Sequence, residues 1–172
     1  MLKRSVEKIL YDNGQVVSEN KDKVNESFVE KFSNITDEDE EAGYIYVLSS
    51  KSKDERIASI ENLYKIGYSK VDVLERIKNA EKEPTYLMAK VKIEDAWKCY
   101  NMNPQKLEQL LHNFFGSSCL NIDIFDENKI RHTPREWFIA PLEVIEQSIQ
   151  LIISGEIVNY RYDIESKIII NR

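Results

Sequence analysis

The sequence has little glycine, proline or cysteine. Five glycines and four prolines in 172 residues exclude a collagen-like chain and a flexible Gly/Ser linker. The two cysteines, Cys99 and Cys119, do not form a CxxC pair, which favours reduced thiols over a disulfide framework and leaves no close ligand pairs for structural zinc. With 42% apolar and 31% charged residues, the chain is expected to fold as one globular domain with extensions.

Long hydrophobic runs are also missing. No stretch of about 18 uncharged apolar residues occurs, and the first ten residues, MLKRSVEKIL, mix charges with apolar positions. This pattern predicts neither a transmembrane helix nor a signal peptide. We therefore expect a cytoplasmic protein without a membrane partner.

An excess of positive charge is missing as well. The net charge is −6, and residues 1–42 hold six Lys or Arg against eleven Asp or Glu, so that residues 43–172 are nearly neutral. Tight nonspecific binding to nucleic acid normally needs a basic surface that releases counterions. Charge alone therefore counts against a polyanionic partner.

Composition divides the chain into three parts. Residues 1–42 are predicted to form an acidic N-terminal arm or short helices, with two apolar stretches that end near Leu10 and Phe32 and a turn at Asp12–Gly14. The five acidic residues 37–41 indicate a solvated linker. A domain over residues 43–155 and a β-rich C-terminal extension over residues 156–172 follow.

The hydrophobic pattern of the remaining sequence alternates between strand and helix periods. Strands are expected at residues 43–48, 63–69 and 86–95, and a short extended segment at residues 136–140. Asp72 is expected to cap a helix over residues 72–82, with Leu74 among its inward-facing residues. Two further helices should run from Asn103 to Gly116 and from Pro141 to Gly155, before a C-terminal hairpin or edge strand. This pattern predicts a mixed α/β (α+β) fold.

Several polar side chains stand where a packed core does not require them. They are a phenol in an apolar strand, an ammonium in the next strand, a guanidinium on the first helix, and a carboxylate and an imidazole four residues apart on the second: Tyr46, Lys65, Arg76, Glu108 and His112. A carboxylate can hold a hard divalent cation, a guanidinium can bind a phosphate, and a phenol or amine can handle the proton of a water molecule. The set suits hydrolysis of a phosphodiester bond.

The order of these residues resembles the GIY-YIG nuclease superfamily over residues 43–153. Residues 44–46 (YIY, after Gly43) lie where the family has GIY, and residues 65–67 (KIG) lie where it has YIG. The pattern LExLLHxxF from Leu107 and REWF from Arg135 is similar to a phage and bacterial branch that uses KIG. The resemblance implies a small three-stranded antiparallel sheet flanked by helices, and a role in restriction, mobility or defence.

The resemblance also implies the roles of the residues. Tyr46 would act as general base or position the attacking water, Arg76 would stabilise the phosphoryl charge, and Glu108 would bind Mg²⁺ or Mn²⁺. Lys65 replaces the second tyrosine of the family and could orient water or neutralise a phosphate oxygen. The expected activity is that of a metal-dependent endonuclease whose partner is DNA.

Other features leave alternatives open. Many relatives carry a histidine where this chain has Ala80, so His112 is a candidate for that role or a structural residue. Glu136 is a catalytic candidate or a surface carboxylate. The whole domain could instead be a noncatalytic DNA- or protein-binding module. The arm could cover the active site as a DNA mimic, or it could pack on the domain. Two chains could also form a homodimer.

Overall fold

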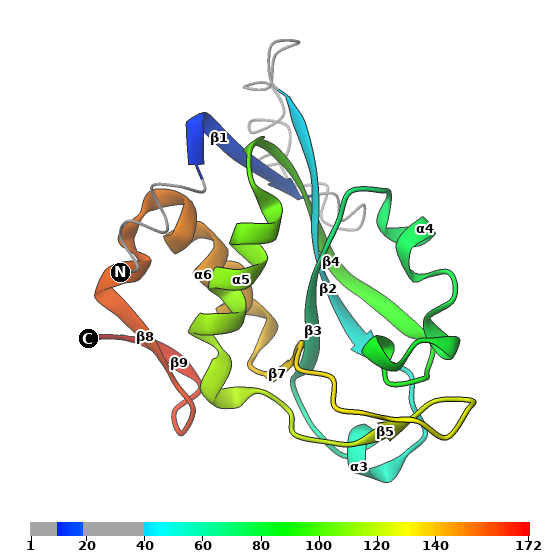
Figure 1. The fold of residues 1–172 in the computed structure, drawn as a ribbon. Helices are drawn as coiled ribbons and strands as arrows, with labels where there is room; N and C mark the ends of the chain where they lie inside the picture. The colour runs from blue at the N-terminus through cyan, green and yellow to red at the C-terminus, as the bar shows by residue number, and fades with distance from the viewer. Residues whose placement is uncertain (1–9, 19–39) are drawn as a thin grey trace.

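The computed structural model describes residues 10–18 and 40–172. Its centre is a five-stranded antiparallel sheet with the strand order β1-β4-β2-β3-β7 (Figure 1). The strands of this sheet are β1 (Leu10–Ser18), β2 (Glu41–Ser50), β3 (Leu63–Ser69), β4 (Val91–Met102) and β7 (Trp137–Ile139).

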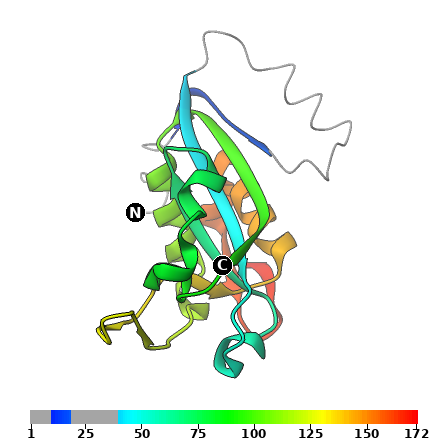
Figure 2. The ribbon, with the colours of Figure 1, turned by 90° about the vertical axis from the view of Figure 1, so that its right-hand side faces the viewer.

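Helices and turns cover both faces of the sheet (Figures 1 and 2). The helices are α3 (Glu55–Ala58), α4 (Val73–Ile77), α5 (Pro104–Phe114) and α6 (Leu142–Ser154). The short 3-10 turns are η2 (Ala80–Lys82), η3 (Pro84–Tyr86), η4 (Gly116–Ser118) and η5 (Glu156–Asn159). Helices α5 and α6 pack on one face, whereas α4, η2 and η3 pack on the other.

The alternation of side chains along β2 divides the core between these two faces. Ile45 and Val47 are buried against α5 and α6, while Tyr46 and Leu48 point to the opposite face and pack with residues of α4, η2 and η3. Tyr46 therefore lies on the side of the sheet where a short helix and two turns leave room for polar groups.

The mixed α/β class is confirmed, but the main sheet is larger than the three strands expected. A short β7 pairs with β3, and β1 pairs with β4. The turn predicted at Asp12–Gly14 is wrong, because these residues lie inside β1, where the register shifts between Leu10 and Gln15. The second apolar stretch of the arm, up to Phe32, lies outside the described residues.

The strand predicted at residues 86–95 is displaced. Pro84 begins a 3-10 turn instead, and Leu87 and Met88 have φ angles of 60° and 53°. Two consecutive left-handed residues turn the chain sharply, and the burial of Tyr86 and Leu87 in different clusters compensates for this uncommon backbone. As a result β4 begins only at Val91.

The helix predicted at residues 72–82 is shorter than expected. Asp72 caps α4 as predicted, since its carboxylate accepts a hydrogen bond of 2.9 Å from the Leu74 backbone N–H. The helix ends at Ile77, and η2 continues the path. The inward orientation predicted for Leu74 is wrong, because its side chain is 68% exposed.

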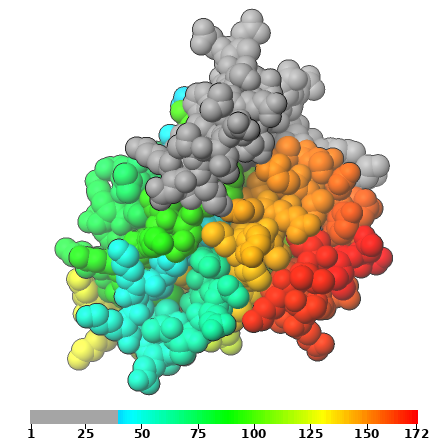
Figure 3. Space-filling model, turned by 180° about the vertical axis from the view of Figure 1, so that it is seen from behind, coloured from blue at the N-terminus to red at the C-terminus, as the bar shows by residue number. Residues whose placement is uncertain are grey.

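The second half of the chain agrees with the sequence pattern. Asn103 caps α5 through the Lys106 backbone N–H, and Gly155, at a φ of 79°, ends α6. The C-terminal segment forms the predicted hairpin, which lies beside α6 when the molecule is seen from behind (Figure 3, red and orange). The remaining strands are β5 (Ile124–Phe125), β6 (Arg131–His132), β8 (Tyr160–Asp163) and β9 (Ile168–Asn171). None of the helices in the described ranges is long and apolar enough to span a bilayer.

Candidate active site

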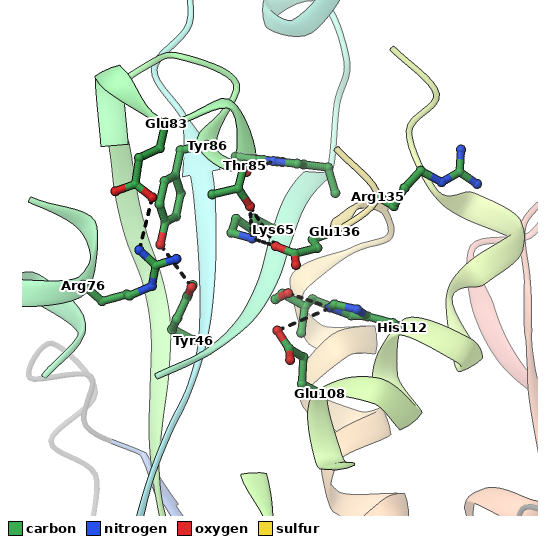
Figure 4. A network of polar contacts seen from close by, with 12 residues as sticks. Tyr46, Lys65, Arg76, Glu83, Thr85, Tyr86, Glu108, His112, Arg135 and Glu136 are labelled. Atoms are coloured by element: carbon green, nitrogen blue, oxygen red, sulfur yellow. Dashed lines mark hydrogen bonds and ion pairs between the residues drawn. The ribbon is translucent and has the colours of Figure 1, made fainter. Parts of the chain in front are cut away.

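The six residues selected from the sequence gather around β3 (Figure 4). Residues of β2, α4 and the turns lie on one side of this strand, and residues of α5 lie on the other. Glu136, which directly precedes β7, lies between them and bonds to Lys65 of β3. Three residues that the sequence analysis did not select complete the arrangement: Glu83, Thr85 and Tyr86.

Tyr46 and Tyr86 form a buried pair of phenols. Their hydroxyl groups share a hydrogen bond of 3.2 Å, and the residues are 2% and 0% exposed. Burial, followed by the hydrogen bond with Tyr86, raises the pKa of Tyr46 well above its usual range. Both phenols are therefore neutral at physiological pH, and Tyr46 can donate or accept a hydrogen bond but is a weak base in this conformation.

Arg76 covers this pair from the solvent side. Its guanidinium carbon lies 5.3 Å from the centre of the Tyr86 ring, a stacking distance for a cation on an aromatic face. Its Nη1 lies 3.3 Å from a carboxylate oxygen of Glu83. The Arg76 side chain is 37% exposed, so a phosphate can reach this cation from solvent.

Lys65 is buried beneath the same surface, and the residue is 1% exposed. Its ammonium group bonds to the Glu136 carboxylate and lies 3.2 Å from the Thr85 hydroxyl. Burial lowers the pKa of Lys65, although the Glu136 carboxylate opposes that effect. The position of Lys65 is that of a group that fixes Glu136 rather than one that meets a ligand from solvent.

Glu136 presents the more accessible end of this ion pair, since its side chain is 40% exposed. The Thr85 hydroxyl donates a second hydrogen bond of 3.0 Å to the same carboxylate oxygen, and the indole N–H of Trp137 holds the Thr85 carbonyl at 3.0 Å. Burial alone would raise the pKa of Glu136, but the charge and hydrogen bond of Lys65 outweigh it and lower that pKa. Glu136 is an oriented, ionised carboxylate.

Glu108 and His112 occupy the part of the β3 edge that the short β7 leaves free. The His112 Nε2–H donates to the Ile66 carbonyl at 2.7 Å, and the Tyr68 backbone N–H donates to the Glu108 carboxylate. Four residues of helix rise about 6 Å, close to the roughly 6.6 Å between alternate residues of a strand. Glu108 and His112, four residues apart on α5, thus form the hydrogen bonds with β3 that a neighbouring strand would otherwise form.

The two side chains differ in their protonation. Burial, followed by repulsion from Glu136, raises the pKa of Glu108 to about 7, while the Lys65 charge and the Tyr68 hydrogen bond oppose the rise. Burial lowers the pKa of His112, so the neutral imidazole, with its proton on Nε2 toward Ile66, is the main form at neutral pH. The Glu108 oxygen lies 4.0 Å from this nitrogen, too far for a hydrogen bond.

The acidic residues allow one mode of metal binding. Over residues 10–18 and 40–172, no group of three or more His, Cys, Asp or Glu side chains has the spacing of a metal site. Mg²⁺ does not require such a cage, because one or two carboxylates suffice when waters and substrate phosphates supply the other ligands. Glu108 fits this mode, since its pKa is raised first by burial and then by repulsion from Glu136, and a bound cation would relieve that repulsion.

Glu83, Thr85 and Tyr86 were not among the candidates from the sequence, because Tyr86 was assigned to a strand and no motif indicated a role for Glu83 or Thr85. The available signal was Pro84, which is disfavoured in a helix interior and in a central strand and therefore marks a turn. A turn next to a candidate catalytic helix is a common location for binding residues.

Two comparisons bear on this arrangement. The model of the T5orf172 domain matches residues 43–153, a range that contains all nine of these side chains. The chain belongs to the T5orf172 domain family. This is a family of nuclease-like, DNA-binding domains, which agrees with the DNA partner that the motif resemblance implied.

The membership corrects the family assignment made from the motifs. Residues 43–153 match T5orf172 and not the GIY-YIG superfamily, so the motif resemblance rested on short strings that did not identify the family. YIY and KIG are three-residue patterns, and strand propensity alone favours such tyrosine and isoleucine combinations.

A curated relative extends the similarity beyond the T5orf172 domain. The uncharacterized protein YeeC of Bacillus subtilis (strain 168) is 38% identical over 153 residues, which cover 89% of this chain and 38% of YeeC. The chain thus spans well under half of that relative. No solved structure matches the chain. The expected homodimer, cytoplasmic location and role in defence stay predictions.

Proposed function

We propose that this T5orf172 domain is a divalent-metal-dependent DNA endonuclease. The observation that carries the proposal is the position of an accessible Arg76 above the Tyr46–Tyr86 pair, across β3 from the carboxylates of Glu108 and Glu136. A cation that binds phosphate, neutral phenols and carboxylates within one small area are the groups that hydrolysis of a phosphodiester requires. In this reaction water adds to phosphorus and a P–O bond breaks, which leaves a phosphomonoester and an alcohol.

Arg76 would bind the scissile phosphate. Its guanidinium can donate two parallel hydrogen bonds to phosphate oxygens, and it stays charged at any working pH. Stabilisation of the charge that develops in the transition state by one such group is worth about 3 kcal/mol. Arg76→Ala should therefore lower turnover more than affinity, whereas an affinity loss equal to the whole rate loss would make Arg76 a docking residue only.

Tyr46 and Glu136 would handle the attacking water. Because burial raises the pKa of Tyr46, its role in this proposal is to position the water and not to deprotonate it. Glu136 is held ionised by Lys65 and can accept a hydrogen bond from the same water. Lys65 then acts through Glu136, and His112 through the placement of α5 on β3.

Glu108 would hold the divalent cation, together with water and phosphate oxygens. When bound, Mg²⁺ or Mn²⁺ neutralises phosphate charge and polarises water. The Glu108 carboxylate must lose its proton before it binds a cation, so metal affinity should rise as the pH increases through about 7.

Incubation of the purified protein with supercoiled plasmid tests the proposal. Wild type should nick the plasmid with magnesium or manganese and should stop when EDTA is added. Arg76→Ala and Glu108→Gln should lose nicking, while Glu165→Gln, a change of an exposed carboxylate in the β8–β9 turn, should retain it. Nicking at wild-type rates by the first two variants would contradict the assignment.

A noncatalytic binding module is the second candidate. The observation in its favour is the burial of Tyr46 and Lys65, which leaves neither group in contact with solvent. A module of this kind would bind DNA or protein but would leave plasmid intact with every divalent metal. The nicking experiment therefore separates the two candidates.

A further inference from the structure

Glu83 has a rigid position between two turns. Its backbone N–H donates to the Ala80 carbonyl at 3.2 Å, and its carbonyl accepts from the Tyr86 N–H at 3.0 Å. Pro84 follows and restricts Glu83 to an extended conformation, with a φ of −113° and a ψ of 124°. The Glu83 side chain makes no capping hydrogen bond to either turn. Its carboxylate is therefore held toward solvent near Arg76 without a role in the turns themselves.

The carboxylate of Glu83 lies where a ligand of Arg76 would bind. One face of the Arg76 guanidinium stacks on the Tyr86 ring, and its Nη1 points to the Glu83 oxygen at 3.3 Å (Figure 4). A carboxylate and a phosphate offer the same pair of anionic oxygens to a guanidinium. A phosphate that approaches Arg76 from solvent thus meets a group of like charge on that edge.

The two ion pairs of the site differ in how readily they can exchange partners. The pair of Lys65 and Glu136 has a buried ammonium and a further hydrogen bond from Thr85, so removal of its carboxylate would leave a buried charge. The pair of Arg76 and Glu83 has a single contact, and its side chains are 37% and 34% exposed. This pair is only partly buried, and ion pairs that solvent reaches contribute little to stability. Only the second pair can give up its carboxylate to a phosphate at low cost.

We propose that Glu83 competes with the substrate for Arg76: its carboxylate occupies the phosphate-binding edge of the guanidinium and leaves when the DNA backbone binds. This inference rests on the proposed function, since it assumes that Arg76 receives a phosphate. Glu83 is then a positioning residue that keeps Arg76 stacked on Tyr86 in the free protein and weakens the binding of phosphates that cannot displace it.

Two matched variants test the competition by DNA binding without catalysis. Binding of a short, fluorescently labelled DNA duplex is measured in EDTA for wild type, Glu83→Gln and Glu81→Gln. Glu81 is an exposed carboxylate two residues away, so its change removes the same charge outside the pair. We expect Glu83→Gln to lower the Kd about two- to fivefold beyond Glu81→Gln, the range that loss of an exposed ion pair allows.

The same two substitutions in the Arg76→Ala protein show whether the gain in DNA affinity depends on Arg76. In the Arg76→Ala protein, Glu83→Gln and Glu81→Gln should change the Kd equally, because no guanidinium remains to be released. In active protein, Glu83→Gln should lower KM while kcat stays close to that of wild type. If Glu83 had only a structural role, its replacement would not lower KM and leave kcat unchanged.

Two results would overturn the inference. Equal Kd values for Glu83→Gln and Glu81→Gln, or weaker binding by Glu83→Gln, would show that the carboxylate does not compete with DNA. Thermal midpoints and the variant Glu83→Ala would show whether any weakening comes from lost folding. Failure of every protein, including wild type, to bind the duplex at low salt would instead reject the DNA partner and with it the proposed function.

Discussion

Gly67 lies directly opposite Tyr46 in the β2–β3 ladder, and the tyrosine ring fills the space where a side chain at Gly67 would stand. A Cβ added to Gly67 would lie 2.4 Å from the ring carbon Cζ of Tyr46 and 2.5 Å from its hydroxyl oxygen. The glycine of the second motif is therefore required by the tyrosine of the first. The two short motifs form one structural unit.

Gly67→Ala should displace the Tyr46 ring. The clash cannot be relieved by a flexible side chain end, so we expect a loss of about 1–3 kcal/mol in the free energy of unfolding and a loss of plasmid nicking. Gly116→Ala is the control, because a Cβ there has no heavy atom within 4 Å. Chemical denaturation and the nicking assay measure both effects. Equal stability and activity of the two variants would mean that the ring can move without consequence.

The sequence allowed the strand part of the site to be predicted but not the turns. Tyr46 and Lys65 stand in strands whose alternation assigns their face, and Glu108 and His112 stand in a helix with a clear cap, so local patterns were sufficient. Glu83 and Tyr86 matter only because the chain turns back after α4 and places them against Arg76. The chain leaves η3 through two left-handed residues, Leu87 and Met88, whose types do not favour such angles, so Pro84 alone indicated a turn in this segment.

Two larger features were also beyond local patterns. The pairing of β1 with β4 joins segments far apart in the sequence, and no periodicity in residues 10–18 indicates a strand. The bond between Lys65 and Glu136 joins residues that lie 71 positions apart. Such contacts follow from the topology of the whole sheet, which a single sequence does not determine.

Glu108→Gln should stabilise the fold at high pH while it removes metal binding. Between pH 4.5 and about 7 the native protein keeps a proton on Glu108 that the unfolded chain releases, so this residue lowers stability as the pH rises through that range. Above pH 7 the cost is about 3 kcal/mol, and a neutral amide avoids it.

Thermal midpoints at pH 5 and pH 8 measure this effect. The midpoint difference between Glu108→Gln and wild type should be larger at pH 8, whereas Glu165→Gln should show no such trend. Added magnesium should raise the midpoint of wild type at pH 8 and leave that of Glu108→Gln unchanged. A lower midpoint of Glu108→Gln at pH 8 would show instead that the carboxylate stabilises the β3 edge more than its burial costs.

The Lys65–Glu136 pair should respond asymmetrically to the removal of either partner. Glu136→Gln leaves an ammonium buried without its counter-charge, and we expect a loss of about 3–5 kcal/mol. Lys65→Met should cost less, because an apolar side chain suits the buried position and Glu136, 40% exposed, can turn to water.

The pH dependence of Glu136→Gln gives a second check of this pair. Without the carboxylate, burial depresses the pKa of Lys65 further, so the unfolded chain binds more protons than the native one and stability should rise with pH. The double variant Lys65→Met/Glu136→Gln should recover most of the free energy of unfolding that Glu136→Gln loses. Equal losses for both single variants at every pH would contradict the asymmetry.

Truncation of the arm should destabilise the sheet through β1. A protein that begins at Glu40 keeps β2 but loses the strand that covers β4, so the backbone groups of Trp97 to Met102 become an unpaired edge. We expect a lower thermal midpoint and a tendency to aggregate. A protein that begins at Leu10 is the control, since it retains β1.

The same truncation tests the electrostatic effect of the arm on DNA. Most of the excess negative charge of residues 1–42 is removed, so DNA should bind more tightly at low salt and the gain should shrink as salt increases. Unchanged affinity at both salt concentrations, with a lower midpoint, would leave the arm with a structural role alone.

The position of Trp137 has a consequence for spectroscopy. The chain contains two tryptophans: Trp97 lies in the core beside α5 and α6, whereas Trp137 holds the Thr85 carbonyl through its indole N–H. Any displacement of the turn that carries Glu83 and Thr85 changes the surroundings of Trp137 alone. In a Trp97→Phe protein, intrinsic fluorescence therefore reports on the turn that carries Glu83 and Thr85. Such a protein would show ligand binding at this turn without an added label.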